Sequence, residues 1–431
     1  MAPAAPGLLR GIRRWDLFLL MVNSTIGAGI FGLPAKVYAL IGPWSLPALA
    51  LCGLVIALVL VCFAEVASRY ERTGGPYLYA RSAFGALVGF ETGWLLWLVR
   101  LTSYAALCNL LVSYLAVLWP PANGAGTRVA VIVAVTAALT AINLIGVRRA
   151  AVTGNVFTIA KLLPLALVIV AGLFAIAPER LAIGPAPAPA NLAKASLLLI
   201  FAFAGFELAI IPAGETDDPR AHLPWALLSG LGAVALVYAL VMAVCVGAVD
   251  GLATSERPVA DAAARALGPW GGGLVAVGAV ISITGTLGAI LLAAPRLTYA
   301  MAECGELPRG LASIHPRFHT PWLAILTTAG AMLLLTLGST FLSALTIGTI
   351  IRLVTYVLTC VAMIALRRRA DAPAATFRAP GGVVTAALAL IACGWLLTSI
   401  SAREAALAGI AAAIGLGIYA LRRGTIAGAR A

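Results

Sequence analysis

Long apolar stretches separated by short polar loops dominate the pattern of this 431-residue chain. A helix of about 20 apolar residues crosses the hydrocarbon core of a bilayer. The apolar runs are continuous rather than alternating, which favours membrane-spanning helices over membrane β-strands. We expect twelve spans, near 15–41, 44–66, 84–118, 128–146, 153–176, 194–214, 223–249, 271–302, 322–338, 341–366, 383–401 and 404–421.

The composition excludes an ordinary soluble protein. Hydrophobic residues make up 62% and charged residues 10% of the chain, against about 45–50% and 25% in globular domains. The formal net charge is +13, but the basic residues lie mostly in short loops. Because they form no stripe interleaved with aromatic residues, we expect no nucleic-acid partner. The protein is expected to be an all-α integral membrane protein.

The loop charges predict an orientation and a division of the chain. With the N-terminus in the cytoplasm, most loop Lys and Arg residues fall on the cytoplasmic side, as the positive-inside rule requires. We therefore expect a multi-pass protein of the cytoplasmic (inner) membrane with both termini inside. The expected parts are an N-terminal segment, two units of five spans and a C-terminal pair of spans, at 1–14, 15–176, 177–366 and 367–431.

Residues 256–268, in an outer loop, are predicted to form a short amphipathic helix, with Pro258 near its start and Gly268 at its end. This helix is either an external flap or a plain connector.

The first span contains three glycines within six residues, Gly27, Gly29 and Gly32, which disfavour a continuous helix. Irregular backbone inside a bilayer is tolerated where protein or a water-filled cavity satisfies its polar groups. A broken helix offers N–H groups to an anion and carbonyl groups to a cation. An α-amino acid carries both charges. The alternative is that the glycines only allow close helix packing, and this segment alone does not decide between the two.

The sixth span carries a second signal. Gly205 and Glu207 place a glycine and a carboxylate in the middle of this span. The first and sixth spans are five apart, and this odd offset gives them opposite orientations. Interrupted helices at matching places in two halves are typical of transporters built from inverted repeats.

These residues and three further stretches resemble the amino acid–polyamine–organocation (APC) permeases. The resemblance covers nearly the whole chain. The four stretches are Gly27–Gly32; Phe63–Glu65 with Gly74–Tyr77 and Phe84–Gly85; Gly205–Glu207 with Gly214–Glu215 and Pro219; and Arg296 with Gly305–Pro308. The resemblance implies ten helices in the inverted-repeat (LeuT-like) fold, two further C-terminal helices and transport by alternating access.

The resemblance also implies a substrate site at the two breaks. In relatives, backbone N–H groups at the first break bind the substrate carboxylate, and carbonyl groups at both breaks bind its ammonium. One aromatic position closes over the substrate and is tryptophan in the arginine/agmatine antiporter; here it is Phe201, which alternatively only packs. The matching positions are Ala28 and Gly29 for the carboxylate, and Thr25, Ile26, Phe201 and Ala204 for the ammonium.

Lys161 and Glu207 are charges inside predicted spans, where burial is costly and function is the default interpretation. Some APC permeases have a lysine at the position of Lys161, whose ammonium takes the place of a sodium ion. Here it either carries a proton or is a permanent cation surrogate, with the Thr286 hydroxyl as a partner, and no sodium requirement is expected. Glu207 either links substrate binding to gate closure, carries a proton, or is structural.

Arg100 and Arg352 lie midway along the third and tenth spans. The resemblance to the arginine/agmatine antiporter implies that both face the substrate, at positions that are uncharged there. Tyr356 follows Arg352 and is an expected gate residue with Phe201 and Glu207. One carboxylate cannot neutralise two arginines and a lysine, so a cationic substrate would be repelled. A neutral or acidic substrate is therefore expected. Alternatively, the arginines pair with Glu207 and never touch substrate.

Other charged residues near the inner ends of spans are expected to form inner-gate ion pairs and topology anchors. They are Glu65, Arg69, Arg72, Arg81, Arg296, Glu303 and Glu306.

The chain has no nucleophile–base set, nucleotide-binding loop or metal-ligand spacing. We expect no enzyme activity, cofactor or metal. The predicted function is secondary transport of an amino acid, by proton coupling or exchange, as a monomer or homodimer. The alternatives are a cationic amino acid or polyamine exchanger and a non-transporting sensor.

Overall fold

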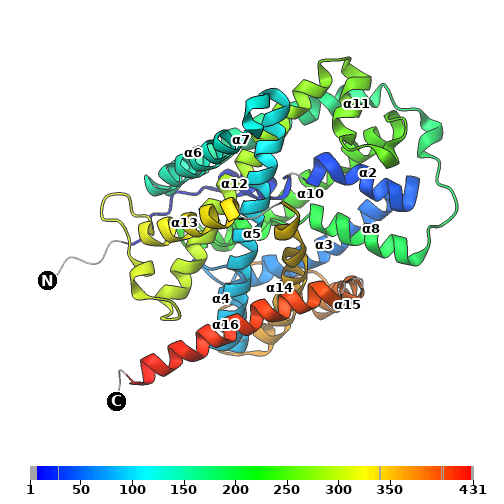
Figure 1. The fold of residues 1–431 in the computed structure, drawn as a ribbon. Helices are drawn as coiled ribbons and strands as arrows, with labels where there is room; N and C mark the ends of the chain where they lie inside the picture. The colour runs from blue at the N-terminus through cyan, green and yellow to red at the C-terminus, as the bar shows by residue number, and fades with distance from the viewer. Residues whose placement is uncertain (1–6, 28, 339–340, 399, 401, 429–431) are drawn as a thin grey trace.

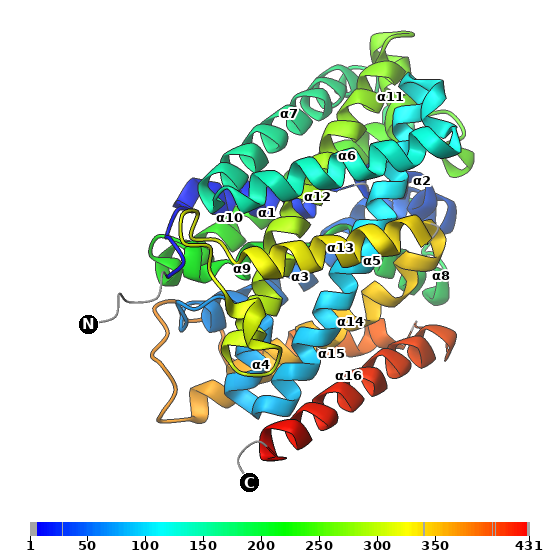
Figure 2. The same cartoon turned by 60° about the vertical axis from the view of Figure 1, so that its left-hand side comes forward.

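The computed structural model describes residues 7–27, 29–338, 341–398, 400 and 402–428. This part of the chain is helical, with short 3-10 turns and one isolated bridge between Ile12 and Thr216. The α-helices, labelled across Figures 1 and 2, are α1 Arg14–Thr25, α2 Gly29–Ile41, α3 Ser45–Ala67, α4 Pro76–Phe84, α5 Ala86–Leu118, α6 Ala125–Leu144, α7 Val147–Leu173, α8 Pro189–Ala202, α9 Glu207–Ile210, α10 Pro219–Ala248, α11 Pro258–Leu267, α12 Gly271–Glu303, α13 Trp322–Gly338, α14 Phe341–Arg368, α15 Val383–Leu397 and α16 Ala402–Gly428.

Nine helical stretches of the described part are long and apolar enough to cross a membrane. One of them, Gly29–Ala67, covers both α2 and α3, while the apolar helices Trp322–Gly338 and Val383–Leu397 are shorter. The long predicted span 84–118 is a single helix, α5. The helical fold of a multi-pass membrane protein is confirmed, and the count of twelve spans stays a prediction.

The long helix α12 lies at the centre of the bundle and packs against α5, α7 and α1. Helix α10 packs against α1 and α3. Figures 1 and 2 show α6 and α7 side by side, with α16 at the opposite edge of the molecule. Helices that are far apart in sequence thus surround the breaks described next.

Both spans predicted to be interrupted are interrupted. Helix α1 ends at Thr25, and Ile26 leaves the helical conformation with φ −75° and ψ 84°. Helix α2 begins at Gly29; Ala28, the other residue predicted at this break, lies outside the described residues. In the sixth predicted span, α8 ends at Ala202 and a turn leads into the short helix α9.

The predicted amphipathic helix at 256–268 is α11, which ends at Leu267 and is followed by Gly268 with φ 80°. Its apolar residues Val259, Ala262 and Ala263 are buried. The helix packs against α2, α7 and α12. It is therefore held by the bundle through one apolar face.

Candidate functional site

A cavity of about 620 Å³ lies beside the two breaks. Its size falls in the range of small-molecule sites, about 300–1,000 Å³. It extends to Glu256, just before α11, and to Glu404 at the start of α16. From the first break its lining includes Thr25, Gly27 and Gly29, and from the second Phe201, Ala204 and Gly205.

The two breaks touch each other. Gly205 has φ 121°, and a Cβ atom there would lie 2.2 Å from the carbonyl oxygen of Ser24. Both facts require glycine, because an L side chain would be strained and would overlap the backbone of α1. The Tyr238 hydroxyl of α10 lies 2.8 Å from the carbonyl oxygens of both Thr25 and Ala202. Tyr238 therefore joins the ends of α1 and α8.

Lys161 of α7 is fully buried against the end of α1. Its Nζ donates to the carbonyl oxygens of Asn23 at 2.9 Å and Ile26 at 2.7 Å, and lies 3.5 Å from the Thr286 hydroxyl. A cation is stabilised at a helix C-terminus, where the carbonyl dipoles point. Thr286 lines the cavity, and Lys161 lies behind it. The structure thus brings Lys161, Ile26 and Thr286 together.

The predicted ammonium-binding carbonyl groups of α1 already have protein partners. The Thr25 oxygen accepts from Gly27 N at 2.9 Å and lies beside Tyr238. The Ile26 oxygen accepts from Lys161 and, at 3.3 Å, from the Ser282 hydroxyl. A carbonyl oxygen has two lone pairs, so the Ile26 oxygen is fully engaged by its two donors, while the Thr25 oxygen shares the single Tyr238 hydroxyl hydrogen with the Ala202 oxygen. Sequence reasoning missed Tyr238 and Ser282, since an ordinary hydroxyl in a span carries no distinctive signal.

The charged residues Arg100, Glu207 and Arg352 form one cluster beside the cavity. Glu207 Oε1 lies 3.0 Å from an Arg100 nitrogen and 3.5 Å from Arg352 Nε. Glu207 Oε2 accepts from Gly205 N at 2.9 Å. The Arg352 guanidinium lies 5.5 Å from the centre of the Phe201 ring. Both arginines pair with Glu207, as one predicted alternative states, and both also line the cavity.

Tyr356 is buried behind this cluster. Its ring centre lies 5.3 Å from that of Phe206 and 5.8 Å from that of Phe63. The cavity lining includes Arg352, one turn before Tyr356 on α14, but does not extend to Tyr356 among the described residues. If Tyr356 takes part in a gate, as predicted, it would do so through its contacts with the rings of Phe63 and Phe206.

At the end of the molecule away from α11, the charged residues predicted to form ion pairs do so. Arg296 contacts Glu215 through two nitrogens, at 2.7 and 3.1 Å, and both side chains are fully buried. An Arg72 nitrogen lies 3.5 Å from Glu303. Arg81 Nε lies 3.1 Å from Glu306.

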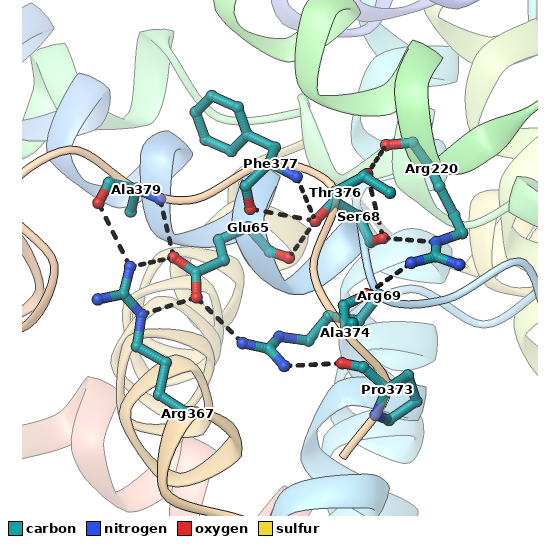
Figure 3. A network of polar contacts seen from close by, with 10 residues as sticks. All are labelled: Glu65, Ser68, Arg69, Arg220, Arg367, Pro373, Ala374, Thr376, Phe377 and Ala379. Carbon is teal, nitrogen blue, oxygen red and sulfur yellow. Dashed lines mark hydrogen bonds and ion pairs between the residues drawn. The ribbon is translucent and has the colours of Figure 1, made fainter.

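A second network at this end fixes the segment 373–379 between α14 and α15 (Figure 3). The buried carboxylate of Glu65 accepts from Arg367 Nε at 2.7 Å, Arg69 at 3.1 Å and Ala379 N at 2.8 Å. Arg69 also donates to the Pro373 carbonyl oxygen at 2.8 Å. The sequence predicted Glu65 and Arg69 as gate residues but gave no signal for the partner segment, which lies about 300 positions away.

The arrangement is that of a membrane carrier, because carriers place their sites at interrupted helices in the core of a bundle. Residues 12–415 match the family model described as amino acid permease, and the chain belongs to this family. The family and the relatives below are transporters rather than enzymes.

Three relatives show the range of this similarity. An uncharacterized transporter of Mycobacterium tuberculosis is 34% identical over 75% of this chain and 73% of its own length. A serine/threonine exchanger of Bacillus subtilis is 29% identical over 95% of both chains. A branched-chain amino acid permease of Bacillus subtilis is 26% identical over 91% of this chain and 88% of its own length.

Proposed function

We propose that the protein carries an amino acid across the cytoplasmic membrane by alternating access. One observation carries the proposal: two broken helices touch each other and line a single cavity of about 620 Å³. The N-terminal end of a helix carries a partial positive charge and the C-terminal end a partial negative charge. An amino acid needs both kinds of charge a few ångströms apart, for its carboxylate and its ammonium group.

The breaks fall in the first and sixth expected spans, which supports a repeat of two units with opposite orientation. In this proposal, residues 15–176 and 177–366 each contribute five spans, and 367–431 adds two. Both termini are cytoplasmic. The cavity then opens outward near α11, while the ion pairs of Arg296 and Glu65 close the inner side.

The substrate carboxylate is proposed to bind at the first break, at the predicted positions Ala28 and Gly29. The first N–H groups of a helix, here α2, lack partners within the helix. The ammonium is proposed to approach the second break at Phe201 and Ala204, which both line the cavity. The Phe201 carbonyl oxygen, like those of Thr25 and Ile26, already accepts from a protein N–H or ammonium group. Phe201, packed near Arg352, is proposed to close over the substrate.

Lys161 is proposed to supply the positive charge that a sodium ion would otherwise provide at the end of α1. Its two short contacts with carbonyl oxygens support this role. Transport is then independent of sodium and is either proton-coupled through Lys161 or an exchange with Lys161 as a fixed cation. Glu207 and Tyr356 are proposed to connect substrate binding to gate movement, and Thr286 to assist Lys161.

The charge of the site favours a neutral or acidic substrate. Arg100 and Arg352 carry two positive charges beside one carboxylate, Glu207, and Lys161 lies at the end of α1. An added cation is repelled in a site of low dielectric constant. Two relatives named for serine/threonine and branched-chain amino acids support a neutral substrate, and the first supports exchange.

Counterflow in sodium-free proteoliposomes tests the proposal, with labelled serine, leucine, glutamate and lysine as the panel. Gly32 lines the cavity, and a Cβ atom there meets nothing within 4 Å. Gly32→Leu therefore places a bulky side chain in the cavity beside the first break and is expected to abolish uptake. Gly232 of α10 has the same open surroundings and is exposed, so Gly232→Leu is the matched control and is expected to retain uptake.

Binding of an amino acid without counterflow by the wild-type protein would overturn the proposal in favour of a sensor. Uptake of lysine above all other substrates would overturn the charge argument and favour a cationic exchanger. Equal uptake by Gly32→Leu and Gly232→Leu would remove the cavity from the transport route.

A further inference from the structure

The charged cluster beside the cavity is unevenly balanced. Arg100 on α5 and Arg352 on α14 face a single carboxylate, Glu207. The side chains of Arg100 and Glu207 are each 1% exposed and that of Arg352 is 10% exposed. The three groups together carry one excess positive charge almost completely removed from solvent. A buried charge is costly unless it is paired.

The hydrogen-bonding groups of the cluster are also incompletely used. Three buried nitrogens have no aligned hydrogen-bond partner among the described residues. They are Arg100 Nε, Arg100 Nη2, which is the nitrogen near Glu207, and Arg352 Nε. The contacts with Glu207 are therefore ion pairs by distance, without full hydrogen bonding. A guanidinium has five N–H donors, and leaving buried donors unpaired costs free energy. The Arg100–Arg352 part of the cavity wall is thus short of an acceptor that carries negative charge, since Glu207 is the carboxylate with which both arginines pair.

We propose that Arg352, Arg100 and Ser103 form an anion subsite in the wall of the cavity. The inference rests on the proposed function, because its occupant enters through the substrate cavity. Arg352 donates to the Ser103 hydroxyl oxygen at 3.2 Å, which leaves the hydroxyl hydrogen available to donate to an anion. The ligand is a carboxylate on the substrate side chain or a small inorganic anion such as chloride.

Arg352 is the specificity-determining residue of this subsite. It is the more exposed of the two arginines and lies farther from Glu207, at 3.5 Å against 3.0 Å. Its guanidinium lies over the Phe201 ring, at the edge of the second break. Arg100 supplies the second guanidinium of the subsite, and Glu207 is the positioning residue, because it accepts from Gly205 N and holds Arg100 close.

The two sources of the anion predict different transport. If a substrate carboxylate fills the subsite, glutamate or aspartate is preferred over serine and leucine, and chloride has little effect on their uptake. If an inorganic anion fills it, a neutral amino acid is preferred, and its uptake falls when gluconate replaces chloride. Arg352 forms a bidentate pair only if the anion is a substrate carboxylate, because a single inorganic ion such as chloride has no pair of oxygens to accept.

Uptake of labelled glutamate, serine and leucine is measured in proteoliposomes in chloride and in gluconate. The proteins are the wild type, Arg352→Gln, Arg352→Lys and Lys194→Gln. Lys194 is an exposed residue of α8, outside the cavity lining, so its variant controls for general loss of positive charge. Arg352→Lys keeps the charge but loses the planar fork.

Arg352→Gln is expected to lower the glutamate-to-serine uptake ratio by about tenfold or more, or to abolish the chloride dependence. Arg352→Lys is expected to lose part of the uptake ratio or of the chloride dependence, and this partial retention shows that the site is folded. Lys194→Gln is expected to match the wild type. An unchanged ratio and unchanged chloride dependence in Arg352→Gln, with wild-type uptake intact, would overturn the subsite alone. Absence of uptake in the wild type would instead overturn the proposed function, and this inference with it.

Discussion

The buried pair of Arg296 and Glu215 allows a stability prediction with a defined magnitude. Both side chains are 0% exposed, and two nitrogens of Arg296 contact the carboxylate. Glu215→Gln leaves a buried guanidinium without its counter-charge. Removal of one partner from a buried pair costs about 3–5 kcal/mol. The exposed pair of Arg10 and Glu71, at 2.7 Å and 49% exposure on each side, is a matched control, because exposed pairs contribute about 0–1 kcal/mol.

The assay is reversible unfolding in mixed micelles, with the denaturing detergent fraction titrated for the wild type, Glu215→Gln and Glu71→Gln. We expect Glu215→Gln to lower the unfolding free energy by about 3–5 kcal/mol and Glu71→Gln by less than about 1 kcal/mol. A double change, Arg296→Met with Glu215→Met, is expected to recover much of the loss, because no unpaired charge remains. Equal effects of the two single variants would refute the reasoning from burial.

Two further predictions concern the same end of the molecule. Burial raises the pKa of Glu306 above its ordinary value, although Tyr77 and Arg81 oppose the shift. The folded state then binds the proton more tightly than the unfolded state, so the unfolding free energy decreases as pH rises from the ordinary glutamate pKa of about 4.3 through the raised value. Glu306→Gln is expected to remove this slope in titrations at several pH values. Glu65→Gln is expected to loosen the segment 373–379, which contains the exposed Arg378. Limited proteolysis measures this change, and trypsin is expected to cleave after Arg378 faster in the variant than in the wild type.

Hydropathy located the helices of the bundle because each long span is predominantly apolar. The predicted range 128–146, for example, corresponds to α6 at Ala125–Leu144, and 153–176 to α7 at Val147–Leu173. The ends shifted because polar residues such as Arg148 start a helix outside the apolar core. The count of spans was harder to derive, since α1 has only 12 residues and α2 runs on towards α3.

The site was predictable where a residue carries charge inside a membrane span or where a glycine stands beside such a charge. Gly205, Lys161 and Arg352 stand out in the sequence, and the structure places all three at the breaks or the cavity. Tyr238 and Ser103 were not predicted, because a hydroxyl in a span has many structural uses. Which carbonyl groups of α1 already have donors depends on helices far away in the chain, so hydropathy and spacing hold no information about it.

The most direct test of the central claim is uptake of labelled amino acids in sodium-free proteoliposomes, with and without an inward proton gradient. The wild type is compared with Lys161→Met, which keeps a similar volume but removes the charge at the end of α1. We predict uptake by the wild type without sodium, and loss in Lys161→Met of the gradient-driven uptake or of the exchange, whichever the wild type shows. A sodium requirement in the wild type, or unchanged uptake in Lys161→Met, would contradict the account.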